Sequence, residues 1–313
     1  METLLSVKNL EKSFQKNKVL KGLSFQAYRG EILCILGPNG AGKSTTINIL
    51  TAALRSDGGE IHFHGKPING RRMHSYKQSL GIVPQDIALY DELSAERNLR
   101  FFASLYGLHG EALQKAVDSA LVFAGLEDRR NDKVKTFSGG MKRRLNIACA
   151  IAHHPQLVIM DEPTVGIDPQ SRNHILDSIK KLRDSGMTII YTTHYMEEVE
   201  AISSRIIIMD HGSIIAEGTK ESLKEDIENE KQYIIQVEGT CSIPKNEFFT
   251  IEGVKDVSID KGTLQITSVK GVENLDRIIA LLTGHGEKIQ NITSESASLE
   301  TVFLKLTGRR LRD

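Results

Sequence analysis

The feature that most constrains the fold is a glycine-rich loop at residues 37–44, which reads GPNGAGKS. Before it, residues 31–36 (EILCIL) are typical of a buried strand, and after it residues 44–54 have the pattern of a helix. A strand that passes through such a loop into a helix provides the context that the phosphate-binding motif G-x-x-x-x-G-K-[ST] requires. A chance glycine-rich turn is the alternative, and this context disfavours it. The segment therefore predicts an α/β domain that binds phosphate groups.

The residue types in this loop suit a chain of phosphates. Glycines let the backbone fold closely around an anion, and the N–H groups at the helix start face it. We predict that Lys43 places its charge at the β- and γ-phosphates and that Ser44 offers its hydroxyl to Mg²⁺. The residues expected to contact the nucleotide here are Gly37, Pro38, Asn39, Gly40, Ala41, Gly42, Lys43, Ser44 and Thr45.

Three later segments, at 156–162, 187–194 and 205–210, are short and rich in apolar residues. Such runs are typical of strands buried on both faces of a parallel sheet. A helical pattern at 169–186 lies between two of them, which indicates βαβ organisation. A membrane-spanning helix needs about 20 apolar residues, so we expect none of these segments to cross a bilayer.

Two carboxylates end the first of these strands, which reads LVIMDE. Asp161 can hold Mg²⁺ through its water shell, and Glu162 can orient and polarise an attacking water. An ordinary charged turn is an equally good interpretation of the two residues taken alone.

The remaining patterns divide the chain into parts. The N-terminal stretch before and after the loop alternates apolar and polar residues between turn signals, which predicts strands. Residues 86–154 have helical spacing. A charged stretch at 221–231 marks a boundary, so we predict domains at 1–225 and 226–313, the second a small α+β domain whose pattern permits a ferredoxin-like order. Helices are expected at 96–108, 111–126, 272–284 and 298–308, and strands at 4–10, 22–28, 58–68, 232–239, 254–260, 262–268 and 287–293.

A set of motifs in a fixed order resembles the ATP-binding cassettes of ABC transporters. Residues 137–141 read FSGGM, which resembles the signature LSGGQ of that family. The resemblance runs continuously from residue 1 to about residue 220. The other matching positions are Gln85 in GIVPQD (the Q-loop), Asp168 in GID (the D-loop), His194 in YTTH (the switch histidine) and Phe14 (the aromatic residue that stacks on adenine).

The resemblance implies the fold and the chemistry. The fold is a P-loop NTPase (RecA-like) α/β core with an N-terminal antiparallel β subdomain, a helical subdomain and, in this chain, a small C-terminal α+β domain. The ligands are ATP and Mg²⁺, with Ser44, Gln85 and Asp161 at the metal. The residues expected to be catalytic are Glu162 as the base, His194 and Lys43 at the γ-phosphate, and Gln85.

The resemblance also implies partners. Ser138, Gly139 and Gly140 face the γ-phosphate of an ATP held by a second nucleotide-binding subunit, so we expect a head-to-tail dimer, a homodimer, with two sandwiched ATP molecules. Transport needs a separate integral membrane permease, which places the chain peripherally on the cytoplasmic face of the membrane. Three widely spaced cysteines, Cys34, Cys149 and Cys241, fit a reducing cytosol.

Two positions depart from the family pattern. Met141 replaces the glutamine of the signature, and Val165 replaces the serine before Gly166. The serine and glycines that meet phosphate remain, so we expect activity to survive. Met141, the basic run that follows it and the segment 298–308 resemble the drug-resistance-type exporter branch, which predicts ATP-driven export.

Other classes of function are disfavoured. The 40 basic and 40 acidic residues balance, which gives no electrostatic reason to expect a nucleic-acid partner. A soluble ATPase that acts on ribosomes or DNA and a regulator without a membrane partner remain as alternatives. Arg309, Arg310 and Arg312 cluster near the C-terminus, where a solvated tail is the expected interpretation. The sequence does not specify the transported substrate.

Overall fold

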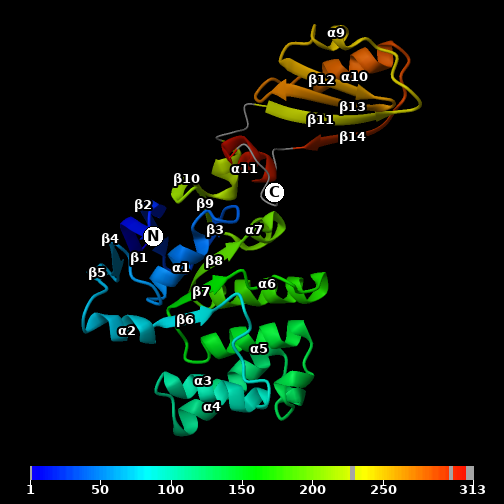
Figure 1. The fold of residues 1–313 in the computed structure, drawn as a ribbon. Coiled ribbons are helices and arrows are strands. Elements are labelled where there is room, and N and C mark those ends of the chain that lie inside the picture. The colour runs from blue at the N-terminus through cyan, green and yellow to red at the C-terminus, as the bar shows by residue number, and fades with distance from the viewer. Residues whose placement is uncertain (1, 226–229, 296–298, 308–313) are drawn as a thin grey trace. The chain divides into compact units, whose positions relative to one another are not determined.

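The computed structural model describes residues 2–225, 230–295 and 299–307 (Figure 1). Its backbone packing divides into two compact units between Lys220 and Glu221. The first unit contains a six-stranded sheet and a four-stranded sheet, and the second unit contains a further four-stranded sheet. The predicted cluster of Arg309, Arg310 and Arg312, and the predicted boundary at residue 226, lie outside the described residues.

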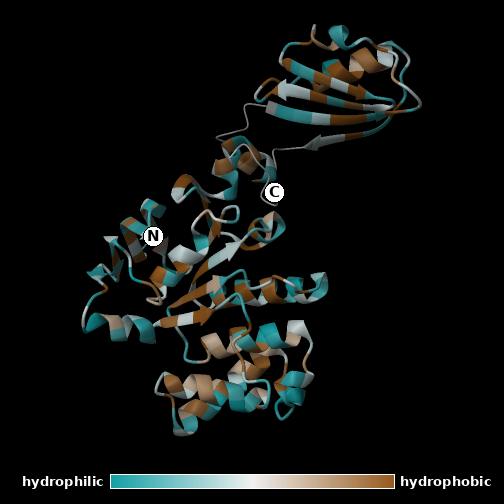
Figure 2. Ribbon diagram, viewed as in Figure 1, coloured by the Kyte–Doolittle hydropathy of each residue, from teal (hydrophilic) through white to brown (hydrophobic). Residues whose placement is uncertain are grey.

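The main sheet of the first unit has the strand order β10-β9-β3-β8-β7-β6. Its strands from β9 to β6 are parallel, and β10 is antiparallel to β9. Every residue of β3 and of β8 is buried, which explains why these segments are rich in apolar residues; Figure 2 shows the same apolar character along β6 and β7. The strands are β3 (Ile32–Leu36), β6 (Leu80–Val83), β7 (Leu157–Asp161), β8 (Thr188–Thr193), β9 (Arg205–Asp210) and β10 (Ser213–Gly218).

Helices connect these strands as expected for βαβ units. α1 (Lys43–Leu50) follows β3, α6 (Pro169–Asp184) follows β7, and α7 (Met196–Ile202) follows β8. α2 (Arg72–Gln78) precedes β6, and the hydroxyl of its Tyr76 donates a hydrogen bond of 2.7 Å to the carbonyl of Leu50 at the end of α1.

The antiparallel sheet of the first unit has the order β2-β1-β4-β5. Leu5 and Leu10 of β1 belong to the same hydrophobic core as Ile35 and Ile190 of the main sheet, so the two sheets share one interior. The strands are β1 (Thr3–Phe14), β2 (Asn17–Tyr28), β4 (Gly58–Phe63) and β5 (Lys66–Pro67).

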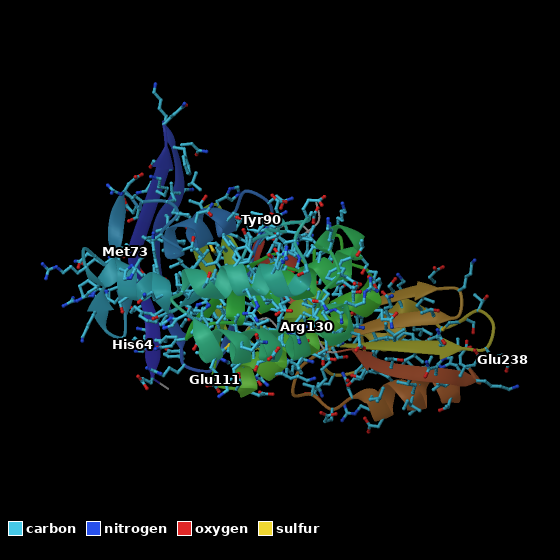
Figure 3. The ribbon with its side chains drawn as sticks, turned by 90° about the horizontal axis from the view of Figure 1, so that it is seen from below. His64, Met73, Tyr90, Glu111, Arg130 and Glu238 are labelled. Carbon is cyan, nitrogen blue, oxygen red and sulfur yellow. The ribbon has the colours of Figure 1, made fainter. Side chains whose placement is uncertain are left out.

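A group of helices with its own core lies between β6 and β7 in the chain. Leu99, Val117, Leu121 and Leu145 are buried together in that core. Arg130, labelled in Figure 3, contacts Glu96 of α3 at 3.1 Å and Asp118 of α4 at 3.2 Å, so it joins the two helices at their polar surface. The elements are α3 (Ala95–Leu105), α4 (Gly110–Ala124), the 3₁₀ turns Glu127–Arg129 and Val134–Thr136, and α5 (Gly139–Ile151).

The second unit contains an antiparallel sheet of order β12-β13-β11-β14. Its chain order β11-α9-β12-β13-α10-β14 is the βαββαβ alternation of a ferredoxin-like fold. Tyr233, Ile235 and Leu264 of the sheet share a core with Ile278 and Leu282 of α10. The elements are α8 (Lys220–Glu225), β11 (Glu230–Val237), α9 (Lys245–Phe248), β12 (Val254–Asp260), β13 (Thr263–Val269), α10 (Leu275–Gly284), β14 (Ile289–Glu295) and α11 (Leu299–Thr307).

Several predicted boundaries are corrected by the structure. The helix predicted at 44–54 ends at Leu50, and Ala52 has a φ of 56°, which a helix does not allow. The strand predicted at 58–68 is two strands, because His64 (φ 51°) and Gly65 (φ 70°) form a turn between them. The region predicted as helical from residue 86 begins its first helix at Ala95. The sequence patterns did not predict α2, β6, α7 or β10.

Candidate functional site

The glycine-rich loop leaves β3 and enters α1 under tight steric constraints. Gly42 caps the helix with a φ of 104°, and a Cβ there would lie 2.7 Å from Cδ2 of Leu20. A Cβ at Gly37 would lie 2.5 Å from the carbonyl oxygen of Met209. Both positions therefore require glycine, because the loop passes too close to neighbouring strands for a side chain.

Lys43 is held inside the loop that precedes it. Its Nζ donates hydrogen bonds to the carbonyls of Gly37 at 2.7 Å and Pro38 at 3.2 Å, and the side chain is 5% exposed. Burial lowers the pKa of Lys43, and the nearby carboxylates of Glu162 and Asp161 oppose that shift. The ammonium group is thus a positioned, poorly hydrated donor at the mouth of the loop.

Thr192 of β8 holds both residues at the end of β7, Asp161 through its carboxylate and Glu162 through its backbone N–H. Oδ1 of Asp161 accepts a hydrogen bond of 2.5 Å from the Thr192 hydroxyl. The backbone N–H of Glu162 donates to the carbonyl of Thr192 at 3.1 Å and lies 3.0 Å from its hydroxyl oxygen. Glu162 has a φ of 45°, in the left-handed region that non-glycine residues adopt rarely and at a cost. Such a conformation, held by a neighbouring strand, is typical of an active-site residue.

Glu162 lies between Lys43 and His194. Oε1 of Glu162 is 3.9 Å from Nζ of Lys43, which is within ion-pair distance. Oε2 of Glu162 is 3.1 Å from Nδ1 of His194, a close contact outside hydrogen-bond geometry. The three residues converge because each follows one of the adjacent parallel strands β3, β7 and β8, whose carboxyl ends meet at one edge of the sheet. A cation, a carboxylate and an imidazole at one edge can bind a phosphate chain and direct a proton transfer.

Gln85 follows the neighbouring strand β6, which pairs with β7, and its side chain is exposed. The structure adds Arg143, which sequence analysis had treated only as part of a basic run. Arg143 is 3% exposed and donates to the carbonyl of Pro84 at 2.9 Å and to that of Gln85. Burial lowers the pKa of Arg143. This arginine fixes the backbone of the Q-loop to α5, and a basic run alone gives no signal for such burial.

The segment with the signature motif starts α5. Ser138 caps that helix and accepts a hydrogen bond of 3.3 Å from the N–H of Met141. A Cβ at Gly140 would lie 2.4 Å from Oγ of Ser171, so the start of α5 packs closely on the start of α6. Asp168 caps α6 by accepting a hydrogen bond of 2.9 Å from the N–H of Ser171, which holds the pKa of Asp168 below its usual value.

The predicted site residues therefore form two groups. Among the described residues, no hydrogen bond or ion pair joins Ser138 or Asp168 to Lys43, Glu162 or His194.

Phe14 ends β1 with 48% of its surface exposed, and Nζ of Lys12 lies 5.6 Å from its ring centroid. In the loop, Asn39, Gly40 and Ser44 are exposed, Thr45 is half-buried, and Pro38 and Ala41 are buried.

Comparisons with known proteins show the family of this chain. A profile of the family described as "ABC transporter" matches residues 20–165. The linearmycin resistance ATP-binding protein LnrL of Bacillus subtilis (strain 168) is 44% identical over 99% of this chain and 100% of its own length. The chain belongs to the ABC transporter family, as an ATP-binding subunit. It binds and hydrolyses ATP, and this hydrolysis powers transport through a separate permease.

Other relatives of this ABC ATP-binding subunit also span its full length. A daunorubicin resistance ATP-binding protein of Streptomyces coeruleorubidus is 32% identical over 100% of this chain and 99% of its own. A Nod factor export ATP-binding protein of Cupriavidus pinatubonensis is 36% identical over 100% of this chain and 93% of its own. No helix in residues 2–225, 230–295 and 299–307 has the length and apolar character that crossing a membrane requires.

Solved structures resemble the ABC subunit over about 70% of its length. The cbiO1 protein of Clostridium perfringens, part of the ABC transporter complex cbiONQ, covers 72% of this chain and 92% of its own at 32% identity, with a TM-score of 0.67. A dimeric ATP-binding cassette in a post-hydrolysis state, bound to ADP and Pi, covers 69% of this chain and 98% of its own at 27% identity, with a TM-score of 0.63.

Proposed function

We propose that this ABC subunit powers the export of a substrate through a membrane permease of the drug-resistance type. The observation that carries the proposal is the convergence of Lys43, Glu162 and His194 at one sheet edge of a chain that matches resistance and export ATP-binding proteins along its full length. Met141 stays compatible with this function, because Ser138 still caps α5 and Gly140 still packs on Ser171.

Each site residue has a role that its position supports. The backbone of the loop from Gly37 to Thr45 cradles the phosphates, and Lys43 neutralises the β- and γ-phosphates. Glu162 is the base that orients the attacking water, and His194 beside it contacts the γ-phosphate. Phe14 stacks on the adenine through its exposed face.

Mg²⁺ suits the oxygen donors at this edge. Asp161 offers a carboxylate that Thr192 orients, Ser44 offers an exposed hydroxyl at the start of α1, and Gln85 offers an amide oxygen after the neighbouring strand β6. Hard oxygen donors of this kind are those that Mg²⁺ prefers, together with phosphate oxygens and water. When bound, the ion would neutralise charge on the β- and γ-phosphates.

A homodimer explains why the site residues fall into two groups. The group of Ser138, Gly139, Gly140 and Asp168 contacts the nucleotide held by the Lys43–Glu162–His194 group of the other subunit. The solved dimeric cassette bound to ADP and Pi supports this arrangement by likeness. The assembled subunit lies on the cytoplasmic face of the membrane, against its permease.

We also propose that residues 1–225 form the ATPase domain and that residues 226–313 form an accessory domain that stabilises the dimer. The separation of the backbone into units between Lys220 and Glu221 supports this division. A chain truncated after residue 225 should bind ATP normally but dimerise more weakly in analytical ultracentrifugation. Unchanged ATP-dependent dimerisation would refute the role of the accessory domain.

The export proposal is tested by affinity purification of the tagged full-length chain from detergent-solubilised membranes, followed by mass spectrometry. We expect a membrane protein with several spanning helices at near-equal stoichiometry. Recovery of ribosomes or soluble proteins only, with the chain absent from membranes, would favour a soluble ATPase instead.

A further inference from the structure

A fully buried glutamate lies next to the candidate site and has no role in the chemistry described above. Glu198 is in α7, four residues after His194, and is 0% exposed. Its Oε1 accepts a hydrogen bond of 2.5 Å from the Thr164 hydroxyl. Its Oε2 accepts hydrogen bonds of 2.8 Å from the Tyr191 hydroxyl and 2.7 Å from the Thr193 hydroxyl. A buried carboxylate is tolerated only when donors satisfy it in this way.

The donors belong to the two segments that carry Glu162 and His194. Thr164 lies two residues after Glu162, in the loop that leads to α6. Tyr191 and Thr193 lie in β8 immediately before His194. The Thr193 hydroxyl, which donates to Glu198, also accepts a hydrogen bond of 3.0 Å from the N–H of Tyr195, so the network holds the backbone on both sides of His194.

Arg172 of α6 joins the same network. Its Nε lies 3.5 Å from Oε1 of Glu198, and its guanidinium lies 4.6 Å from the ring centroid of Tyr195. Glu198 therefore contacts the loop after β7, the last residues of β8 and the first turn of α6. A carboxylate accepts hydrogen bonds but cannot donate them. All three hydroxyls must therefore donate to the Glu198 carboxylate.

We infer that Glu198 is a positioning residue for ATP hydrolysis, which holds the Glu162 segment and the His194 segment at the separation that turnover requires. The inference rests on the proposed roles of Glu162 and His194. Catalysis is sensitive to such placement, because a displacement of about 1 Å can lower a rate roughly a hundredfold. The loop at residues 37–45 is proposed to cradle the phosphates, and among the described residues no hydrogen bond or ion pair joins Glu198 to this loop.

The test is Glu198→Gln in the full-length chain, with Glu31→Gln as the matched control. Glutamine keeps the shape of the side chain but presents an NH₂ donor where Glu198 only accepts. Glu31 is also buried, at 6% exposed, and accepts hydrogen bonds of 2.7 Å from both the Tyr28 N–H and Nη2 of Arg205. It precedes β3 at the opposite edge of the main sheet, so the control makes the same chemical change away from the site.

We expect Glu198→Gln to lower kcat at least about tenfold while the KM for ATP stays within about twofold, and Glu31→Gln to leave both constants near those of the wild type. The unfolding midpoints of the two variants are compared to separate a loss of stability from a loss of placement. A wild-type kcat in Glu198→Gln, or an equal fall in Glu31→Gln, would overturn the inference.

Thr193→Val is a second test that stands even if Glu198→Gln does not fold. It removes one hydroxyl from the network and keeps the side-chain shape, so kcat should again fall with the KM for ATP retained. An unchanged kcat would overturn the inference. Glu162→Gln is measured in parallel: normal turnover in that variant would refute the assigned site itself, whereas its loss together with normal Glu198→Gln turnover would refute only the positioning role.

Discussion

The main sheet of the first unit and the sheet of the second unit both contribute apolar side chains to a core, but their strand directions differ. In the first, β3, β8, β7 and β6 are parallel, so the segments that follow them leave at one edge. In the second, β12, β13, β11 and β14 are antiparallel, so their connections alternate between two edges. Polar groups that end successive strands therefore converge only in the first sheet.

Because of this difference, the residues of the candidate site come together in the first unit, and the role we propose for the second unit is a supporting one. Lys43, Glu162 and His194 meet because of strand direction, although more than 100 residues separate Lys43 from Glu162 in the chain. In the second unit, Lys231 pairs with Glu273 at 2.6 Å, and the Glu273 side chain of this pair is 82% exposed. We expect substitutions in the two units to affect different measurable properties.

The largest difference is expected between two lysine variants. Lys43→Ala removes a buried, poorly hydrated cation from the phosphate loop, so ATP affinity should fall at least about tenfold and turnover should be lost. Lys231→Ala removes a partly exposed cation from the second unit and should leave both unchanged. Titration with a fluorescent ATP analogue measures the affinities. Equal ATP affinities in the two variants would contradict the expected difference between the two units.

A core substitution in the second unit should lower stability and leave ATP turnover unchanged. Leu264 is 0% exposed in the core beneath β13, so Leu264→Ala should lower the free energy of unfolding of that unit by about 2–5 kcal/mol. Denaturant unfolding of the full-length chain measures the loss. At denaturant concentrations below the unfolding transition, ATP turnover should stay near the wild-type rate. A loss of turnover in proportion to the loss of stability would show that the two units do not act independently.

A smaller effect is expected at the adenine. Phe14→Ala should weaken ATP binding by about 1 kcal/mol or more, with kcat at saturation little changed, because stacking contributes to binding alone. The measurement is the KM for ATP beside kcat. Tyr233→Phe, a conservative aromatic change in the core of the second unit, serves as the control, and an unaltered KM in Phe14→Ala would remove Phe14 from the site.

A separate effect is expected as a pH dependence of the first unit. Burial of the ring, reinforced by His154, lowers the pKa of His153 to about 4, although the hydrogen bond with the Leu80 carbonyl opposes the shift. Between about pH 6.5 and about pH 4 the unfolded chain binds a proton that the folded unit does not, so stability falls as the pH falls. His153→Gln should reduce the change of the unfolding midpoint with pH across this range. If the unfolding midpoint changes with pH equally in the wild type and in His153→Gln, the assigned role of His153 is contradicted.

The strand patterns predicted where residues 37–44, Glu162 and His194 lie in the fold, and the structure places each directly after a strand of the main sheet. The buried strands 31–36, 187–194 and 205–210 lie close to their predicted places, and the four strands predicted after residue 231 form one sheet. The predictions failed where local patterns are weak. β6 is only four residues long, and α2 buries Tyr76 alone, so neither has a period that stands out.

The supporting residues around the site could not be predicted for a different reason. Arg143 and Glu198 are charged residues in charged stretches, which normally indicate a solvated face. Their burial depends on carbonyls and hydroxyls supplied by segments remote in the chain, such as Pro84 for Arg143 and Thr164 for Glu198. Only the tertiary structure brings these partners together.

The most direct test of the account is Glu162→Gln studied with ATP and Mg²⁺ by size-exclusion chromatography and by turnover. If Glu162 is the base at a site that two subunits complete, turnover should fall by about 10²–10⁴-fold, and the variant should elute as a dimer that retains ATP. Steady-state turnover near the wild-type rate, or a monomer that holds ATP without forming a dimer, would contradict the account.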